Sequence, residues 1–305
     1  MRPLHGILLK IASVMVFITM ASLIKATDGR IPPGEVVFFR SIFAVPIIVT
    51  WLAWRHELGT GFRAKAPLAH LWRGFVGTMA MGLGFAGLLF LPLPEVTAIG
   101  YAAPLLTVVF AAMFLGEQVR LFRISAVAVG IVGVLIVLSP RLSVGADLSE
   151  TQMLGAFLVL GSAVFAALAQ VFVRKLVHTE STSAIVFWFS LTASALSLIN
   201  LPFGWVIPGP GDAALLILAG LLGGVGQVLL TSSYRHADAS VIAPFEYVSI
   251  IFALAIGYWI FDEVPTLTML GGAALVVAAG VLIIWRERQL GLERNRQRKA
   301  MTPQG

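Results

Sequence analysis

The chain of 305 residues contains no cysteine, and only 12% of its residues are charged. The absence of cysteine excludes disulfides, thiolate nucleophiles and cysteine-ligated metal sites. About 25% charged residues is typical of soluble domains, which need them to cover their surface. The low charge, 58% hydrophobic residues and a mean hydropathy of +0.94 therefore exclude a soluble globular protein and predict an integral membrane protein.

Motifs of the common enzyme classes are also missing. The sequence has no HExxH pair, no GxSxG elbow and no glycine-rich loop that ends in lysine. Metalloprotease, serine-hydrolase and ATP-driven chemistry therefore lack their usual residues. Three carboxylates near helix ends, Glu117, Asp262 and Glu263, are expected on opposite sides of the membrane and form no catalytic pair. We expect neither an enzyme nor a bound cofactor or metal.

Long apolar runs separated by short polar or Pro/Gly-containing breaks predict ten transmembrane helices, because each span needs roughly 20 apolar residues. The expected helices occupy residues 6–26, 36–54, 72–91, 94–115, 124–139, 153–173, 184–203, 212–233, 239–260 and 267–285. No segment is left over for a soluble domain. The expected fold class is therefore all-α and integral to the membrane, with residues 286–305 as a basic cytoplasmic tail.

Lysine and arginine are distributed unevenly between alternate loops. With a cytoplasmic N-terminus, the cytoplasmic segments hold 16 of the 21 basic residues, Arg73 among them, whereas the opposite loops hold only Lys25, Arg30 and Arg141. Positive residues are retained on the cytoplasmic side during insertion. We therefore expect a multi-pass protein of the cell inner membrane, in contact with membrane lipid, with both termini cytoplasmic. The net charge of +6 then reflects topology, and no nucleic-acid partner is expected.

The two halves of the chain resemble each other weakly. Several residues align at a shift of 149 positions: Gly6, Ser13, Lys25, Phe38 and Ser41 with Gly155, Ser162, Arg174, Phe187 and Ser190. The glycine-rich runs at 74–87 and 220–227 also occupy corresponding places, which favours close helix packing. Because each half holds five helices, the second repeat (151–285) must enter the membrane opposite to the first (1–140). Inverted repeats are typical of secondary transporters, which bind cargo near the midplane between the halves.

Three segments carry a resemblance to a known family. They are PPGEVVFFRSIFA at 32–44, LPEVTAIGYAAPLLTVVFAAMFLGE at 93–117 and ASVIAPFEYVSIIFALAIGYWIFDEVP at 239–265. The chain resembles the EamA group of the drug/metabolite transporter superfamily, which implies a carrier with its cavity lined by the first four helices of each half. Within that group the first half looks most like bacterial riboflavin uptake proteins, with carriers of S-adenosylmethionine second.

Ionisable residues inside spans are costly, so each needs a physical reason. Arg40 either snorkels to the outer interface or pairs with Glu95, or else it binds a carboxylate, phosphate or ring carbonyl in a cavity. Glu246 follows a proline break and is expected to be a proton or substrate site, the alternative being a neutral acid hydrogen-bonded to a neighbouring helix. Lys10 is expected to reach the inner interface with its long side chain.

Helix four contains a second proline break, at Tyr101 and Pro104, so we expect one broken helix from each half to face the centre. Polar and aromatic residues of the second half supply further candidates, although glutamines often bridge helices and tryptophan often marks the interface. The predicted substrate-binding set is Arg40, Tyr101, Pro104, Gln170, Trp188, Gln227, Glu246 and Tyr247.

Taken together, these features predict a secondary transporter of the inner membrane that takes up riboflavin or a similar aromatic metabolite. Export of amino acids or related metabolites, and uptake of S-adenosylmethionine, are retained as alternatives. A membrane scaffold without transport has no need of broken helices or of charge at membrane depth. A homodimer is retained as one form of assembly.

Overall fold

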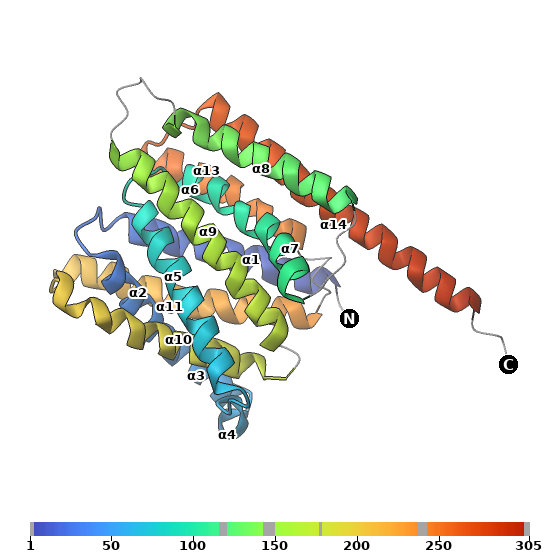
Figure 1. Ribbon diagram of the computed structural model, residues 1–305. Coiled ribbons are helices and arrows are strands. Elements are labelled where there is room, and N and C mark those ends of the chain that lie inside the picture. The colour runs from blue at the N-terminus through green and yellow to red at the C-terminus, as the bar shows by residue number, and fades with distance from the viewer. Residues whose placement is uncertain (1–2, 116–120, 143–149, 177–178, 237–242, 302–305) are drawn as a thin grey trace.

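The computed structural model describes residues 3–115, 121–142, 150–176, 179–236 and 243–301, and all regular secondary structure in these ranges is helical (Figure 1). The helices in chain order are α1 (Pro3–Lys25), α2 (Pro33–Ile42), α3 (Ala44–Trp54), α4 (Leu58–Gly61), α5 (Pro67–Gly87), α6 (Leu93–Gly100), α7 (Ala102–Leu115), α8 (Leu121–Leu142), α9 (Glu150–Leu176), α10 (Thr182–Ser197), η1 (Leu198–Phe203), α11 (Pro210–His236), η2 (Ala243–Val248), α13 (Ser249–Phe261) and α14 (Leu267–Met301).

Over the residues that the structure describes, each of the ten predicted segments coincides with one helix or with two consecutive ones, which confirms the all-helical fold. Seven of the described segments are long and apolar enough to cross a membrane, and two further apolar helices, 124–140 and 245–261, are shorter. The predicted tail begins as a continuation of α14, which runs as one helix to Met301. Large apolar side chains are exposed along α8, among them Ile124, Val132 and Leu135, as expected for a helix that faces lipid.

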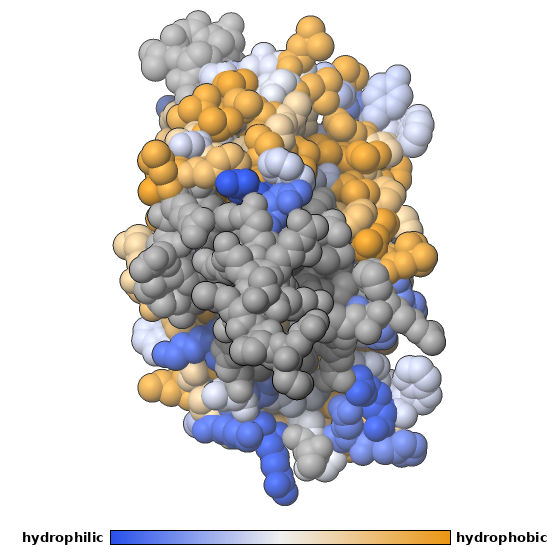
Figure 2. Space-filling model, turned by 90° about the vertical axis from the view of Figure 1, so that its right-hand side faces the viewer, coloured by the Kyte–Doolittle hydropathy of each residue, from blue (hydrophilic) through white to orange (hydrophobic). Residues whose placement is uncertain are grey.

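The helices form a bundle in which partners come from different parts of the chain. α1 packs along α11, α5 along α9, and α8 along α14. The helices α8 and α14 lie side by side on one flank of the bundle (Figure 1). α1 begins and α14 ends on the same side of the bundle. That end is predicted to be cytoplasmic and is called the inner end below, and the opposite end is called the outer end. Seen from the inner end, hydrophilic side chains gather along the lower edge, whereas the upper flanks are mainly hydrophobic (Figure 2).

Prolines divide two of the predicted spans. α2 ends at Ile42, four residues before Pro46, and α6 ends at Gly100, four residues before Pro104. A proline ring clashes with the carbonyl four residues earlier and provides no N–H for it, so both helices stop there. The break in the first-half helix of 94–115 was predicted, whereas the span 36–54 was predicted as one helix. In the second half, the 3-10 helix η2 leads into α13 at Ser249.

Candidate functional site

Two arginines meet at one aromatic ring between the halves of the chain. Arg40 lies on α2 and Arg73 on α5, and the ring of Phe189 comes from α10. The guanidinium carbon of Arg73 lies 3.6 Å from the ring centroid, and that of Arg40 lies 5.7 Å from it. Both distances fall within the range of cation–π contacts. Arg40, Arg73 and Phe189 are called the arginine cluster below.

The arginine cluster is buried and rich in unused donors. Arg40 is only 3% exposed, so snorkelling to the outer interface does not describe its position. The Nε and Nη1 atoms of both Arg40 and Arg73 are buried and have no hydrogen-bond partner among the described residues. Because a guanidinium remains charged and carries five N–H groups, these donors favour an anionic acceptor.

Glycines make room for the two guanidinium groups. A Cβ atom at Gly77 would stand 2.6 Å from Nη1 of Arg73, and one at Gly223 would stand 3.1 Å from Nε of Arg40. Both glycines belong to the runs that the sequence placed at corresponding positions of the two halves. Close helix packing was the expected role of these runs, and in the structure they also accommodate the arginine side chains.

A second charged group lies beside the broken helix of the second half. Lys10 of α1 forms an ion pair and hydrogen bond with Glu246 of η2. The side chain of Lys10 is 3% exposed and that of Glu246 is 46% exposed. The prediction that Lys10 reaches the inner interface is therefore wrong, because its ammonium group is held inside the bundle by a carboxylate 236 residues away. Glu246 remains accessible on one side of the pair.

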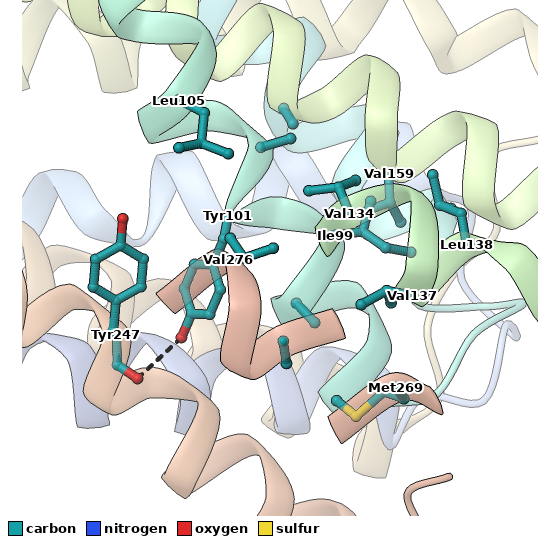
Figure 3. Close-up of a cluster of buried hydrophobic side chains, with 14 of the residues drawn as sticks. Ile99, Tyr101, Leu105, Val134, Val137, Leu138, Val159, Tyr247, Met269 and Val276 are labelled. Carbon is teal, nitrogen blue, oxygen red and sulfur yellow. Dashed lines mark hydrogen bonds between the residues drawn. The ribbon is translucent and has the colours of Figure 1, made fainter. Parts of the chain in front are cut away.

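The two broken helices touch through tyrosine side chains. The Tyr101 hydroxyl donates to the Tyr247 carbonyl over 3.2 Å (Figure 3) and lies 2.5 Å from the Ser249 hydroxyl. The rings of Tyr101 and Tyr247 pack edge to face with centroids 5.0 Å apart. Ser249 in turn donates to the Glu246 carbonyl over 2.7 Å. These contacts join the breaks of both halves to the Lys10–Glu246 pair.

The other predicted residues lie outside both groups. Nε1 of Trp188 donates to the Phe62 carbonyl over 2.9 Å, which ties α10 to the chain before α5. Pro104 and Gln170 are exposed, and Gln227 is half-buried on α11. The structure therefore brings Tyr101, Glu246 and Tyr247 together and places Arg40 in a separate cluster.

At the outer end, one carboxylate joins three chain segments. Oε1 of Glu263 lies 2.8 Å from Nζ of Lys25, and its Oε2 accepts the Leu93 N–H over 2.9 Å at the start of α6. Lys25 also donates to the Leu91 carbonyl over 2.9 Å. Glu263 therefore satisfies a backbone donor at the start of α6 and pairs with the last residue of α1. Glu117, which the sequence analysis considered together with Glu263, lies outside the described residues.

Carboxylates also bridge the halves where helices begin. Oε2 of Glu35 accepts the Val206 N–H over 3.0 Å, before α11. Oε1 of Glu180 accepts the N–H groups of Lys65 and Ala66, each over 2.7 Å, before α5. An acidic side chain of each half thus satisfies orphan donors near a helix start in the other half.

An exposed pair adds a further link at the outer end. Nη2 of Arg30 donates to Oδ1 of Asp212 over 2.8 Å, which joins the loop after α1 to the start of α11. This hydrogen bond raises the pKa of the Arg30 guanidinium above its ordinary value. Arg30 is half exposed, so the pair lies apart from the buried arginine cluster.

Arg73 is the main residue that the sequence analysis left out of the candidate site. It was counted with the basic residues of the cytoplasmic side, at the start of the expected helix 72–91, but it is the seventh residue of α5 and its guanidinium is buried. At 1.5 Å per residue it lies about 9 Å from Pro67, and Arg40 lies about 10 Å from Pro33 at the opposite end. Gly77 lies one turn after Arg73 and has no side chain, so the sequence already indicated space beside Arg73 for its long side chain.

Comparison with known proteins finds similarity to transporters over nearly the whole chain. Residues 4–139 and 153–285 each match the EamA-like transporter family. The chain belongs to this family. Residues 95–203 also match solute carrier family 35. The EamA-like chain has no described group of three or more His, Asp or Glu side chains arranged to hold a metal.

Relatives of this EamA-like protein are transporters with different named cargoes. It is 30% identical to a pseudopaline exporter of Pseudomonas aeruginosa over 280 residues, which cover 90% of this chain and 94% of the relative. It is 28% identical to an S-adenosylmethionine uptake transporter of Rickettsia bellii, covering 87% and 88%. A solved crystal structure with 19% identity aligns with a TM-score of 0.66 over 93% of this chain and 98% of the other, which supports the fold.

Proposed function

We propose that the protein is a secondary transporter that takes up S-adenosylmethionine or a related amino-acid metabolite across the cell inner membrane. The observation that carries this cargo is the similarity to the Rickettsia uptake transporter over most of both chains. The sequence-based expectation of riboflavin has no such support among the relatives reported above. The pseudopaline exporter favours export as the second candidate direction.

Alternating access of two inverted five-helix halves is the mechanism we propose, with both termini in the cytoplasm. Its support is a pair of matching hydrogen bonds. The Ser13 hydroxyl donates to the Gly226 carbonyl over 3.0 Å, and the Ser162 hydroxyl donates to the Ala80 carbonyl over 2.7 Å. Ser13 and Ser162 are the residues that align at a shift of 149. The first helix of each half thereby binds the third helix of the other half.

Glu246 is the residue that we assign to coupling between the two broken helices. It pairs with buried Lys10, and its backbone carbonyl accepts the Ser249 hydroxyl that lies next to Tyr101. Movement of either broken helix therefore has to rearrange this group of side chains. A carboxylate that is accessible on one side of a buried ion pair is suited to exchange a proton or a cargo ammonium during that rearrangement.

The test is uptake of labelled S-adenosylmethionine and, separately, labelled riboflavin into right-side-out vesicles that contain the protein. We expect saturable entry of S-adenosylmethionine and a loss of about tenfold or more in Glu246→Gln, since a hydrogen bond to a charged group contributes that much. Asp262→Asn serves as the matched control because Asp262 is an exposed carboxylate at the outer end.

Each other outcome has a distinct meaning. Entry of riboflavin alone keeps the carrier and rejects the proposed cargo. Exit from loaded vesicles without entry rejects uptake in favour of export. Absence of flux for every tested solute revives the scaffold alternative. Equal entry in Glu246→Gln and wild type rejects the assigned role of Glu246.

A further inference from the structure

We infer that Arg40 and Arg73 together bind a carboxylate group of the transported molecule, an inference that rests on the transport function proposed above. The arginine cluster lies between the first half, which provides both arginines, and the second half, which provides Phe189. Cargo sites of secondary transporters lie where the halves meet near the midplane. Arg40 and Arg73 lie about 10 Å and 9 Å from the starts of their helices, which begin at opposite ends of the bundle.

Burial of the two cations calls for a compensating anion. Arginine stays protonated, and a buried charge without a counter-charge is strongly unfavourable. Neither Arg40 nor Arg73 forms an ion pair with a described acidic residue. Glu35 precedes Arg40 on the same helix by five residues, or about 7.5 Å of rise, and its Oε2 is used by the Val206 N–H.

The contacts with Phe189 leave guanidinium donors available. The guanidinium carbon of Arg73 lies 3.6 Å from the ring centroid, and the Nε and Nη1 atoms of both arginines have no hydrogen-bond partner among the described residues. The N–H groups of a guanidinium lie in one plane as a fixed fork. Such a fork forms two parallel hydrogen bonds with a carboxylate, which gives both affinity and orientation. Phe189 therefore positions the donors without consuming them.

Comparison of the two halves separates this site from ordinary helix packing. Ser41 aligns with Ser190 at the shift of 149, so Arg40 aligns with Phe189 itself. At a shift of 146 positions, which also aligns Glu117 with Glu263, Gly77 aligns with Gly223. The space is thus common to both halves, whereas the positive charges occur in one. A packing requirement shared by the halves does not explain two cations in the first half alone.

The experiment measures binding to the full-length protein purified in detergent, without transport. Labelled S-adenosylmethionine is the probe, and its decarboxylated analogue, which lacks only the carboxylate, is the competitor. We expect wild type to bind the analogue about 10- to 100-fold more weakly, the range for loss of hydrogen bonds to a charged group. In Arg40→Gln and Arg73→Gln the two molecules should bind with similar affinity. Arg30→Gln, an exposed arginine of the same half, should behave as wild type.

Arg40→Lys and Arg73→Lys keep the charge and remove the planar fork, so they can replace the glutamine variants if those do not fold. We expect the lysine variants to prefer S-adenosylmethionine over its decarboxylated analogue, but less strongly than wild type does. Discrimination that stays at the wild-type level in folded Arg40 and Arg73 variants overturns the inference. So does tight binding of riboflavin, a neutral molecule, that is unaffected by these substitutions.

If wild type does not bind S-adenosylmethionine, the proposed cargo fails and the anion site is tested separately. Glutamate, succinate and inorganic phosphate are then each measured for stabilisation of the purified protein against heat. Stabilisation by a carboxylate that disappears in Arg40→Gln and Arg73→Gln supports the inference. Stabilisation by phosphate alone, or by none of the three, overturns it.

Discussion

Replacement of Glu263 tests whether the outer-end network stabilises the bundle. Its two carboxylate oxygens serve different partners, the Leu93 N–H at 2.9 Å and the Lys25 ammonium at 2.8 Å. A hydrogen bond to a charged group contributes about 1.5–3 kcal/mol, and an ion pair that is only 13–16% exposed adds to it. We therefore expect Glu263→Ala to lower the free energy of unfolding by about 3 kcal/mol.

Glu263→Gln retains an oxygen for the Leu93 N–H and removes only the charge, so its expected loss is about 1 kcal/mol. The assay is thermal unfolding of the purified protein, in which 1 kcal/mol corresponds to roughly 2 °C for chains of this size class. Asp262→Asn removes the neighbouring charge and tolerates the left-handed φ of 54° at that position. Equal melting of Glu263→Ala and Asp262→Asn refutes the reasoning. Equal losses for the alanine and glutamine variants reject the assigned acceptor role.

Two further predictions concern packing and use the same melting assay. In Gly280→Ala the new Cβ would collide with the hydroxyl of Tyr247, so we expect a loss of about 1–3 kcal/mol, and unchanged melting would contradict this placement. Ser13→Ala and Ser162→Ala should each cost about 1 kcal/mol, because each serine makes one cross-helix hydrogen bond. Ser125→Ala is the control, since its hydroxyl bonds within its own helix on an exposed face. A large effect at only one of the two serines would count against equivalent halves.

The helices were predictable from the sequence because their signal is local. A run of about 20 apolar residues identifies a span without any knowledge of its neighbours. Breaks at Pro46 and Pro104 follow from the same local chemistry, since each helix ends four residues before its proline. The sequence analysis used this rule at Pro104 and overlooked it at Pro46. The break before Pro46 was therefore predictable from the sequence, although the span 36–54 was predicted as one helix.

The partners of charged residues were not predictable in the same way. Lys10 and Glu246 are 236 residues apart, and only the packing of α1 against η2 brings them together. Arg73 was counted with the cytoplasmic charges because topology counts treat arginines near a helix end as interfacial. Its burial depends on Phe189 and on the space left by Gly77, both of which are tertiary features. Sequence alone could mark these residues as unusual but not pair them.

The two halves differ at the arginine cluster, where we propose that cargo binds. The paired hydrogen bonds of Ser13 and Ser162 suit a structural role that both halves need. At the Arg40 position the second half has the aromatic ring of Phe189, which both arginines contact within the range of cation–π interactions. If the repeat were exact, residue 189 would be an arginine like Arg40, and the aromatic ring between the halves would be missing. In the proposed site, the first half therefore provides the positive charge and the second half provides the aromatic ring beside it.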